Sequence, residues 1–147
     1  MKVIKLIMVL VTVMLLTGCS KKEDFTVISQ SDVVGNSDVS IKEVKYETDK
    51  MYTNFPGFNE ADLENGMYMF NTSDGVTYIL FHSDGVHYSD ISFSIEDKIL
   101  QIKYQSEVEE GFGTNVMFLV KKKDENAYDT IDLQNNGGSD HFNMSYS

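Results

Sequence analysis

The amino-acid sequence predicts a mainly β protein, folded as a single antiparallel β-sandwich or partly open barrel. Apolar and polar residues alternate with a period of two over most of the chain after residue 38, which is the pattern of half-buried strands. Clusters of Gly, Asn, Asp and Ser separate these runs, as turns separate short strands. Only one stretch, residues 59–65, has the start and stop signals of a short helix.

The first predicted elements are short. Residues 25–28 are expected to form a strand, and residues 29–40, rich in Ser, Asp, Gly and Asn, are expected to form a loop. The alternating runs 39–41 and 44–46 are out of phase with each other. This slip predicts a bulge or a strand break near residues 42–43.

The helical stretch follows one further strand. Residues 51–55 are predicted to be that strand, and Pro56 ends it. In the helix predicted over 59–65, Asn59 is a good N-cap, acidic residues fill the first turn, and Gly66 stands where a helix commonly stops. The helix therefore has room for only one or two turns.

Strands then follow one another closely along the chain. Residues 96–98 are predicted to be a tight turn between two long strands. Short strands with polar connections favour an antiparallel meander, which buries one face of each strand and so predicts a sandwich. The strands predicted after the helix are 67–70, 76–81, 86–96, 99–105, 116–122, 129–133 and 142–146.

The tetrad Ser-Asp-Gly-Val occurs twice, at residues 73–76 and 83–86. Asp-Gly between β-rich runs is a strong hairpin signal, because a type I′ turn needs positive φ at both central positions. One strand plus one turn accounts for the spacing between the copies. We therefore interpret the duplication as two turns in a sheet and not as a ligand-binding repeat, which needs three or more copies.

The N-terminus has the layout of a secretory signal peptide. A short lysine-containing stretch precedes an uncharged run over residues 6–16, which is too short to span a bilayer, since that takes about 20 apolar residues. Residues 16–19, Leu-Thr-Gly-Cys, resemble the lipobox of bacterial lipoproteins. The resemblance implies cleavage between Gly18 and Cys19 and a diacylglycerol group on the Cys19 sulfur. The lipid bilayer is thus a predicted partner, through acyl chains on Cys19.

The lipobox also implies how the chain is organised. Residues 1–18 are the predicted signal peptide, 19–24 a lipidated tether, and 25–147 a single β-rich domain. The predicted location is the extracytoplasmic face of a cell membrane. Lysine and asparagine are abundant and arginine is absent, which indicates an AT-rich genome and favours a Gram-positive cell.

Charge limits the partners of the mature chain. Once Lys2 and Lys5 leave with the signal peptide, 10 lysines remain against 23 acidic residues, so the net charge is −13. Nucleic-acid binding depends on clusters of Arg and Lys and is therefore excluded. An acidic domain of this kind is expected to stay monomeric and to favour a cationic partner.

No catalytic residue, metal site or cofactor is predicted. The chain contains no Gly-x-Ser-x-Gly elbow, and its two Asp-Gly loops lack the ligand spacing of an EF-hand. His82 and His87 are placed to lie side by side across a hairpin, but no short His-x-His or His-Glu-x-x-His pairing supports a transition-metal site with His141. We interpret these histidines as surface or strand-end residues.

Two aromatic loops are candidates for binding. Phe112 lies between two glycines and follows Glu109 and Glu110, so an aromatic anchor flanked by carboxylates is the predicted partner-binding loop. The alternative is that the ring folds back onto the sheet, and the sequence leaves both open. Phe55 and Phe58 flank the only proline and are expected to fold back as a lid.

A second resemblance covers residues 76–123. The stretches YSDISFSIEDKILQIKYQ and NVMFLVKKK look like the β domain of small bacterial proteins described as protease-complex subunits or protease stabilisers. Where that family has Gly-Gly-Tyr, this chain keeps Gly85 and Tyr88. The resemblance implies a protein-binding module.

These observations predict a non-enzymatic lipoprotein that binds another envelope protein, in an inhibitory, exclusion or stabilising role. A small-molecule or ion-binding lipoprotein is the alternative, and a wall-modifying enzyme is a third hypothesis.

Overall fold

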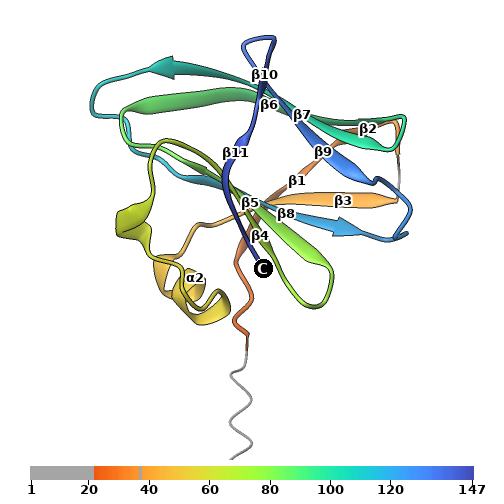
Figure 1. Ribbon diagram of the computed structural model, residues 1–147, viewed down its shortest axis with the longest axis horizontal. Coiled ribbons are helices and arrows are strands. Elements are labelled where there is room, and N and C mark those ends of the chain that lie inside the picture. The colour runs from red at the N-terminus through yellow and green to blue at the C-terminus, as the bar shows by residue number, and fades with distance from the viewer. Residues whose placement is uncertain (1–21, 37) are drawn as a thin grey trace, which may run out of the picture.

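The computed structural model describes residues 22–36 and 38–147, and its strands form two sheets (Figure 1). The six-stranded sheet has the order β1-β3-β8-β5-β4-β11, and the five-stranded sheet has the order β10-β9-β7-β6-β2. In the first sheet the strands are β1 (Val27–Ser31), β3 (Val39–Val44), β8 (Val116–Lys122), β5 (Val76–His82), β4 (Gly66–Asn71) and β11 (Phe142–Tyr146). In the second they are β10 (Gly138–Asp140), β9 (Thr130–Asn135), β7 (Ile99–Val108), β6 (Val86–Glu96) and β2 (Val33–Val34).

The sheets pack face to face, which confirms the predicted β-sandwich. Phe93 of the five-stranded sheet meets Phe118 of the six-stranded sheet, with 5.0 Å between ring centroids. Phe81 and Tyr104 make a second edge-to-face contact between the sheets at 5.2 Å. The inter-sheet core also contains Val39, Ile41, Met67, Ile79, Leu100, Ile102, Val120, Ala127, Tyr128 and Leu133.

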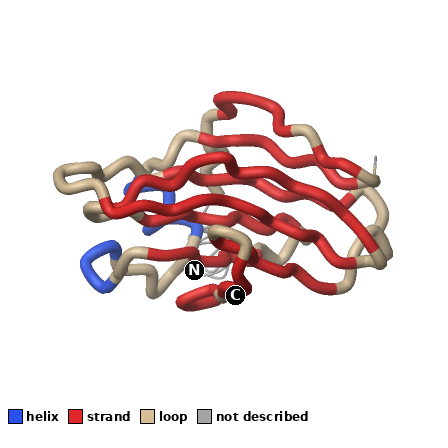
Figure 2. Tube along the Cα trace, turned by 90° about the horizontal axis from the view of Figure 1, so that it is seen from above, coloured by secondary structure: helices blue, strands red, loops and turns tan. Residues whose placement is uncertain are grey.

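The six-stranded sheet is buried on its outer face as well. In β5, Ile79 and Phe81 point into the inter-sheet core, whereas Tyr78 and Leu80 join a second apolar cluster, which we call the outer core. Strands covered on both faces carry continuous apolar runs rather than alternation. The helical segments α2 (Thr48–Asn54) and η1 (Glu60–Asp62) belong to the segment over this outer face, and both lie in the left part of Figure 2, one clear of the strands and one overlapped by them.

Helix α2 replaces the strand predicted over residues 51–55. An isolated strand here would need a neighbour for its backbone groups, whereas a helix satisfies them internally, as in the bond from the Phe55 N–H to the Met51 carbonyl (2.9 Å). Lys50 and Glu47 add an i,i+3 ion pair at 2.6 Å. The helix presents the fully buried Met51 to the outer core, so tertiary burial decided its conformation.

The helix predicted over 59–65 is one 3₁₀ turn, η1. Asn59 caps it as expected, because its side chain accepts a hydrogen bond from the Ala61 N–H at 3.4 Å. The chain is already extended at Leu63, where the cap of η1 has φ −79° and ψ 133°. The short helix is thus confirmed, with an earlier end.

The phase slip predicted near residues 42–43 has a different cause. Strand β3 pairs with β8 without interruption. Val39 and Ile41 face the inter-sheet core, whereas Val44 faces the outer core, so the apolar residues change face along one continuous strand. The bulge lies in the neighbouring strand β1, between Val27 and Ser29.

Both sheets are mixed, which differs from the expected antiparallel meander. The pairs β2–β6, β7–β9 and β4–β11 are parallel. Among the described strands, the chain changes sheets at six connections, which are β1–β2, β2–β3, β5–β6, β7–β8, β8–β9 and β10–β11. Strands that follow one another in sequence therefore often lie in opposite layers, and a strand that returns to its first sheet can run parallel to its new neighbour.

The two Asp-Gly copies have different roles in the structure. Gly75 has φ +78° and Gly85 has φ +77°, while neither aspartate has a positive φ. The first copy closes the β4–β5 hairpin as a Thr72–Gly75 turn whose last residue is the left-handed Gly75, not as the predicted type I′ turn. The second carries the chain from one sheet to the other.

Type I′ geometry occurs at two other turns. Asp97 and Lys98 have φ +49° and +62° between β6 and β7, where a tight connection was predicted. Asn136 and Gly137 have φ +50° and +80° between β9 and β10. Both pairs link antiparallel neighbours, as this turn type requires.

Candidate functional site

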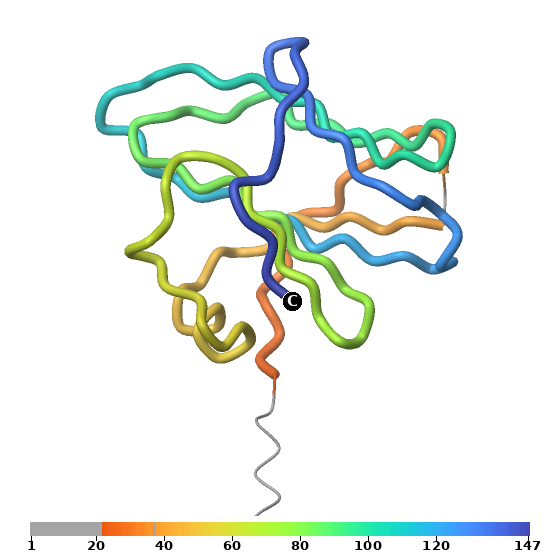
Figure 3. Tube along the Cα trace, viewed as in Figure 1, coloured from red at the N-terminus to blue at the C-terminus, as the bar shows by residue number. Residues whose placement is uncertain are grey.

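The candidate site lies where β6 begins and β7 ends. These are the longest strands of the sandwich, with 11 and 10 residues, and in Figure 3 the green and teal pair reaches away to the left of the view. The loop over residues 109–115 joins the end of β7 to β8 in the other sheet. We call this region, residues 85–87 and 107–112, the β6–β7 end.

Pairing of β6 with β7 brings an imidazole to two carboxylates. His87 lies opposite Glu107 in the antiparallel register, and Glu109 follows two positions later, on the same side of the chain in an extended backbone. The His87 Nδ1 atom is 3.3 Å from Glu109 Oε2 and 3.7 Å from Glu107 Oε1. The three side chains are partly or largely exposed, at 36%, 75% and 53% for His87, Glu107 and Glu109.

Backbone hydrogen bonds hold the loop against the start of β6. The Gly85 N–H donates to the Phe112 carbonyl at 2.6 Å, and the Glu109 N–H donates to the Gly85 carbonyl at 3.0 Å. The Phe112 N–H closes a turn onto the Glu109 carbonyl at 3.0 Å. Glu109 and Phe112 are thus positioned by a segment more than twenty residues away in sequence.

Phe112 lies between the two conformations that the sequence left open. Its ring packs on the His87 imidazole, with centroids 4.5 Å apart and a 38° angle between the planes. The residue is only half-buried, so one part of the ring faces solvent. Glu110 is exposed beside it.

An exposed valine lies at the same strand end, on the other face of β7. Val108, at the last paired position of β7 opposite Val86, is 89% exposed. Phe112 gives the β6–β7 end an apolar part on the face of His87, Val108 adds an exposed apolar side chain on the opposite face of β7, and Glu107, Glu109 and Glu110 give the region negative charge. The sequence indicated Phe112, Glu109 and Glu110 as a partner-binding loop but did not place Glu107 and His87 beside them. The spacing of Glu107 and Glu109 was the available signal, since residues i and i+2 share one face of a strand.

The other aromatic loop is part of the core. Phe55 and Phe58 are 6% and 4% exposed and pack against Phe70 in the outer core, with ring centroids 5.0 and 5.7 Å from it. This confirms that both rings fold back onto the sheet. The surface they cover is the outer face of the six-stranded sheet.

The three histidines are not arranged as the hairpin interpretation expected. His82 ends β5 and His87 lies in β6, in different sheets, so no strand pairing sets them side by side. His82 has a buried Nδ1 atom without a hydrogen-bond partner among the described residues. His141 is 86% exposed, with Nδ1 3.6 Å from Asp140 Oδ1.

Comparison with known proteins leaves the site to be interpreted from its own residues. No protein-family model, curated protein or solved structure matches the chain.

A second region of interest is where the described chain begins, next to the predicted lipid anchor. Gly18 and Cys19 lie outside the described residues. Within the described part, no helix has the length and hydropathy to cross a bilayer.

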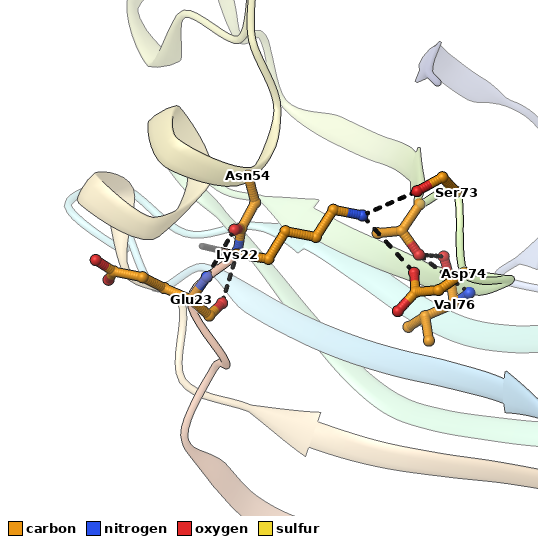
Figure 4. A network of polar contacts seen from close by, with 7 residues as sticks. Lys22, Glu23, Asn54, Ser73, Asp74 and Val76 are labelled. Carbon is orange, nitrogen blue, oxygen red and sulfur yellow. Dashed lines mark hydrogen bonds and ion pairs between the residues drawn. The ribbon is translucent and has the colours of Figure 1, made fainter. Parts of the chain in front are cut away.

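The described part of the predicted tether is hydrogen-bonded to the sandwich (Figure 4). The Glu23 N–H donates to Asn54 Oδ1 at 3.0 Å, and Asn54 Nδ2 donates to the Glu23 carbonyl at 2.8 Å. Lys22 Nζ reaches Ser73 Oγ at 3.4 Å and Asp74 Oδ1 at 3.8 Å. Phe25 then enters the outer core.

Proposed function

We propose that the protein is a lipoprotein of the extracytoplasmic membrane face that binds another envelope protein through its β6–β7 end, without catalysis. The observation that carries this proposal is the half-buried Phe112 ring, which packs on His87 beside the exposed carboxylates of Glu107 and Glu109 at the end of the longest strands. An envelope protein with a basic, apolar-tipped surface is the partner that fits this chemistry.

The composition of the β6–β7 end supports a protein partner. Aromatic and apolar side chains that become fully desolvated contribute most of the affinity at interfaces. Carboxylates around them speed the approach of a cationic partner and disfavour acidic ones. The whole chain has a formal charge of −11, so its long-range field acts in the same direction as the local one.

The anchor and the start of the sandwich support an oriented arrangement on the membrane. Four peptide links separate Cys19 from Glu23, a reach of at most about 14 Å in an extended chain. Because Glu23 is held by Asn54 next to α2, the outer face would lie near the bilayer. The β6–β7 end lies away from the point where the chain enters (Figure 1), so it stays open to a partner in the envelope.

Crosslinking in cells tests the proposed binding surface. The anchored protein is expected to crosslink to one dominant envelope protein, and Phe112→Ala is expected to reduce that product at least about tenfold, as loss of a central aromatic anchor does. The double variant Glu109→Gln/Glu110→Gln should also reduce the crosslinked product. The reduction should be larger at low salt than at high salt, because salt screens the attraction between the glutamates and a cationic partner.

Tyr52→Ala is the matched control, since Tyr52 is a 47% exposed aromatic on α2, away from the β6–β7 end. The control should crosslink like the parent. Crosslinking that survives Phe112→Ala unchanged would exclude this surface.

A further inference from the structure

Three metal-ligating atoms converge at the β6–β7 end. The Nδ1 atom of His87 and one carboxylate oxygen from each of Glu107 and Glu109 all lie within 4.8 Å of one another. Among the described residues no other set of three His, Cys, Asp or Glu side chains comes this close. The set combines one nitrogen with two oxygens, contributed by two strands and the loop that follows them.

The spacing suits a single small cation. Bonds of about 2.0–2.1 Å to a tetrahedral ion place neighbouring ligand atoms about 3.3 Å apart. The separations from His87 Nδ1 in the structure are 3.3 Å to Glu109 Oε2 and 3.7 Å to Glu107 Oε1. Both glutamate side chains are exposed, so they have room to adjust around an ion.

The backbone around the ligands is fixed before any ion arrives. His87 and Glu107 are held by their register in the sheet, and Glu109 is held by its hydrogen bond to Gly85. The Phe112 ring packs against the imidazole at 4.5 Å and limits its rotation. A site whose ligands are already positioned loses less entropy when it binds.

Charge and donor type point to one class of ion. Two carboxylates close together repel each other, and a divalent cation between them removes that repulsion. Calcium and magnesium prefer oxygen ligands throughout, whereas imidazole with carboxylate suits zinc and its neighbours in the first transition row. We propose that His87, Glu107 and Glu109 bind one zinc-class divalent ion, with a fourth coordination position open to water.

This inference is independent of the proposed protein partner, because it concerns the isolated chain. Titration calorimetry with Zn²⁺ tests it, using the full chain in mild detergent with Cys19→Ser to remove the only thiol as a competing ligand. One equivalent of Zn²⁺ is expected to bind. His87→Gln, and separately Glu109→Gln, should each weaken binding at least about tenfold, since even outer-shell partners of metal ligands are worth 10–100-fold.

The chain supplies two matched controls. His141 sits beside a single carboxylate, Asp140, and Glu110 neighbours the site without belonging to the set of three. His141→Gln and Glu110→Gln should both bind Zn²⁺ like the parent. Bound zinc should also raise the melting temperature of the parent but not of His87→Gln, which separates binding to the folded site from adsorption.

Two results would overturn the proposal. One is a parent protein that binds no Zn²⁺, or binds it equally well after His87→Gln. The other is a site that binds Ca²⁺ as tightly as Zn²⁺, because the absence of a preference for Zn²⁺ would show that the imidazole is not a ligand.

Discussion

Tyr88 and Tyr104 lie at the rim of the inter-sheet core, with rings 6.0 Å apart, near the Asp140 carboxylate. The Tyr104 hydroxyl donates a hydrogen bond to Asp140 Oδ2. Burial, followed by the Asp140 charge, raises the pKa of Tyr88 to about 12. Burial and the hydrogen bond to Asp140 raise the pKa of Tyr104 as well. Both hydroxyls are therefore neutral in the folded protein well above the ordinary range for tyrosine.

Alkaline pH is expected to unfold the protein through these tyrosines. A tyrosine in the unfolded chain ionises near pH 10. Below that pH the buried, neutral Tyr88 and Tyr104 therefore contribute fully to the stability of the folded state. Between about pH 10 and the Tyr88 value of about 12 the unfolded state loses the proton first, and stability falls. Urea unfolding at increasing pH measures the slope of the free energy of unfolding against pH.

Tyr88→Phe should make that slope shallower, because the hydroxyl whose pKa is raised is then absent. Equal slopes for Tyr88→Phe and the parent would contradict this explanation.

Gly35 follows β2 at a close approach between two backbones. It has φ +93°, and a Cβ built there would lie 2.4 Å from the Ile95 carbonyl oxygen. Gly57 has nearly the same φ, +94°, but a Cβ there would meet nothing within 4 Å. The two glycines therefore separate the steric effect from the conformational one.

Alanine at the two positions should have different costs. Gly57→Ala is expected to lower the free energy of unfolding by about 1–2 kcal/mol, for the left-handed backbone alone. Gly35→Ala should cost about 1–3 kcal/mol more, because the backbone of β6 must shift. Chemical denaturation of both variants tests this, and equal losses would show that the contact at Ile95 relaxes freely.

Helix α2 exists because the outer face of the six-stranded sheet needs cover. Met51 is fully buried against a cluster that includes Phe70, Leu80 and Met117. Its neighbour Tyr52 is 47% exposed, so alternate sides of the same helical turn have opposite environments. The helix is short, and burial rather than intrinsic propensity stabilises it.

Met51→Ala should therefore destabilise the protein by about 2–5 kcal/mol, the cost of an unfilled cavity in a core. Tyr52→Ala is the comparison within the same turn and should cost less than about 1 kcal/mol. Thermal or urea unfolding distinguishes them. Similar values for the two variants would mean that Met51 is not packed as described.

The molecule as a whole has two distinct ends. The chain enters beside α2, where Asn54 holds Glu23, and the β6–β7 end reaches away from this point (Figure 1). In the proposed function, a lipid on Cys19 confines the domain close to the membrane and raises its effective concentration toward envelope partners. In the same proposal, the short link between Cys19 and Glu23 keeps the orientation of the domain relative to the membrane uniform.

Cys19→Ser tests the anchor directly. The variant is expected to leave the membrane fraction for the medium, because it has no thiol to carry the acyl chains of the proposed anchor. Ser20→Ala, at the next position, should stay with the membrane. A Cys19→Ser protein that is processed and retained like the parent would rule out lipid anchoring.

Local patterns were sufficient for much of the fold. The strands predicted over 86–96 and 116–122 have the same bounds in the structure, because turn residues mark both ends of each. Asn59 caps η1 as expected, and Asp97-Lys98 makes the predicted tight turn. Each of these depends on residues adjacent in sequence.

In the candidate site, the sequence indicated Glu109, Glu110 and Phe112 as one loop with aromatic and acidic character. It did not place His87 beside them, because that contact depends on the β6–β7 register and on the backbone bonds between Gly85 and the loop. Register is a property of two strands together, and the period-two pattern of one strand does not contain it.

What the sequence by itself determined is the β class, the position of most strands, and the acidic, arginine-free character of the chain. Only the tertiary structure decided which sheet each strand joins, which pairs run parallel, and that residues 48–54 fold as a helix. The physical reason is that strand pairing and burial of a second sheet face depend on contacts between distant segments. The same long-range contacts bring His87, Glu107 and Glu109 together.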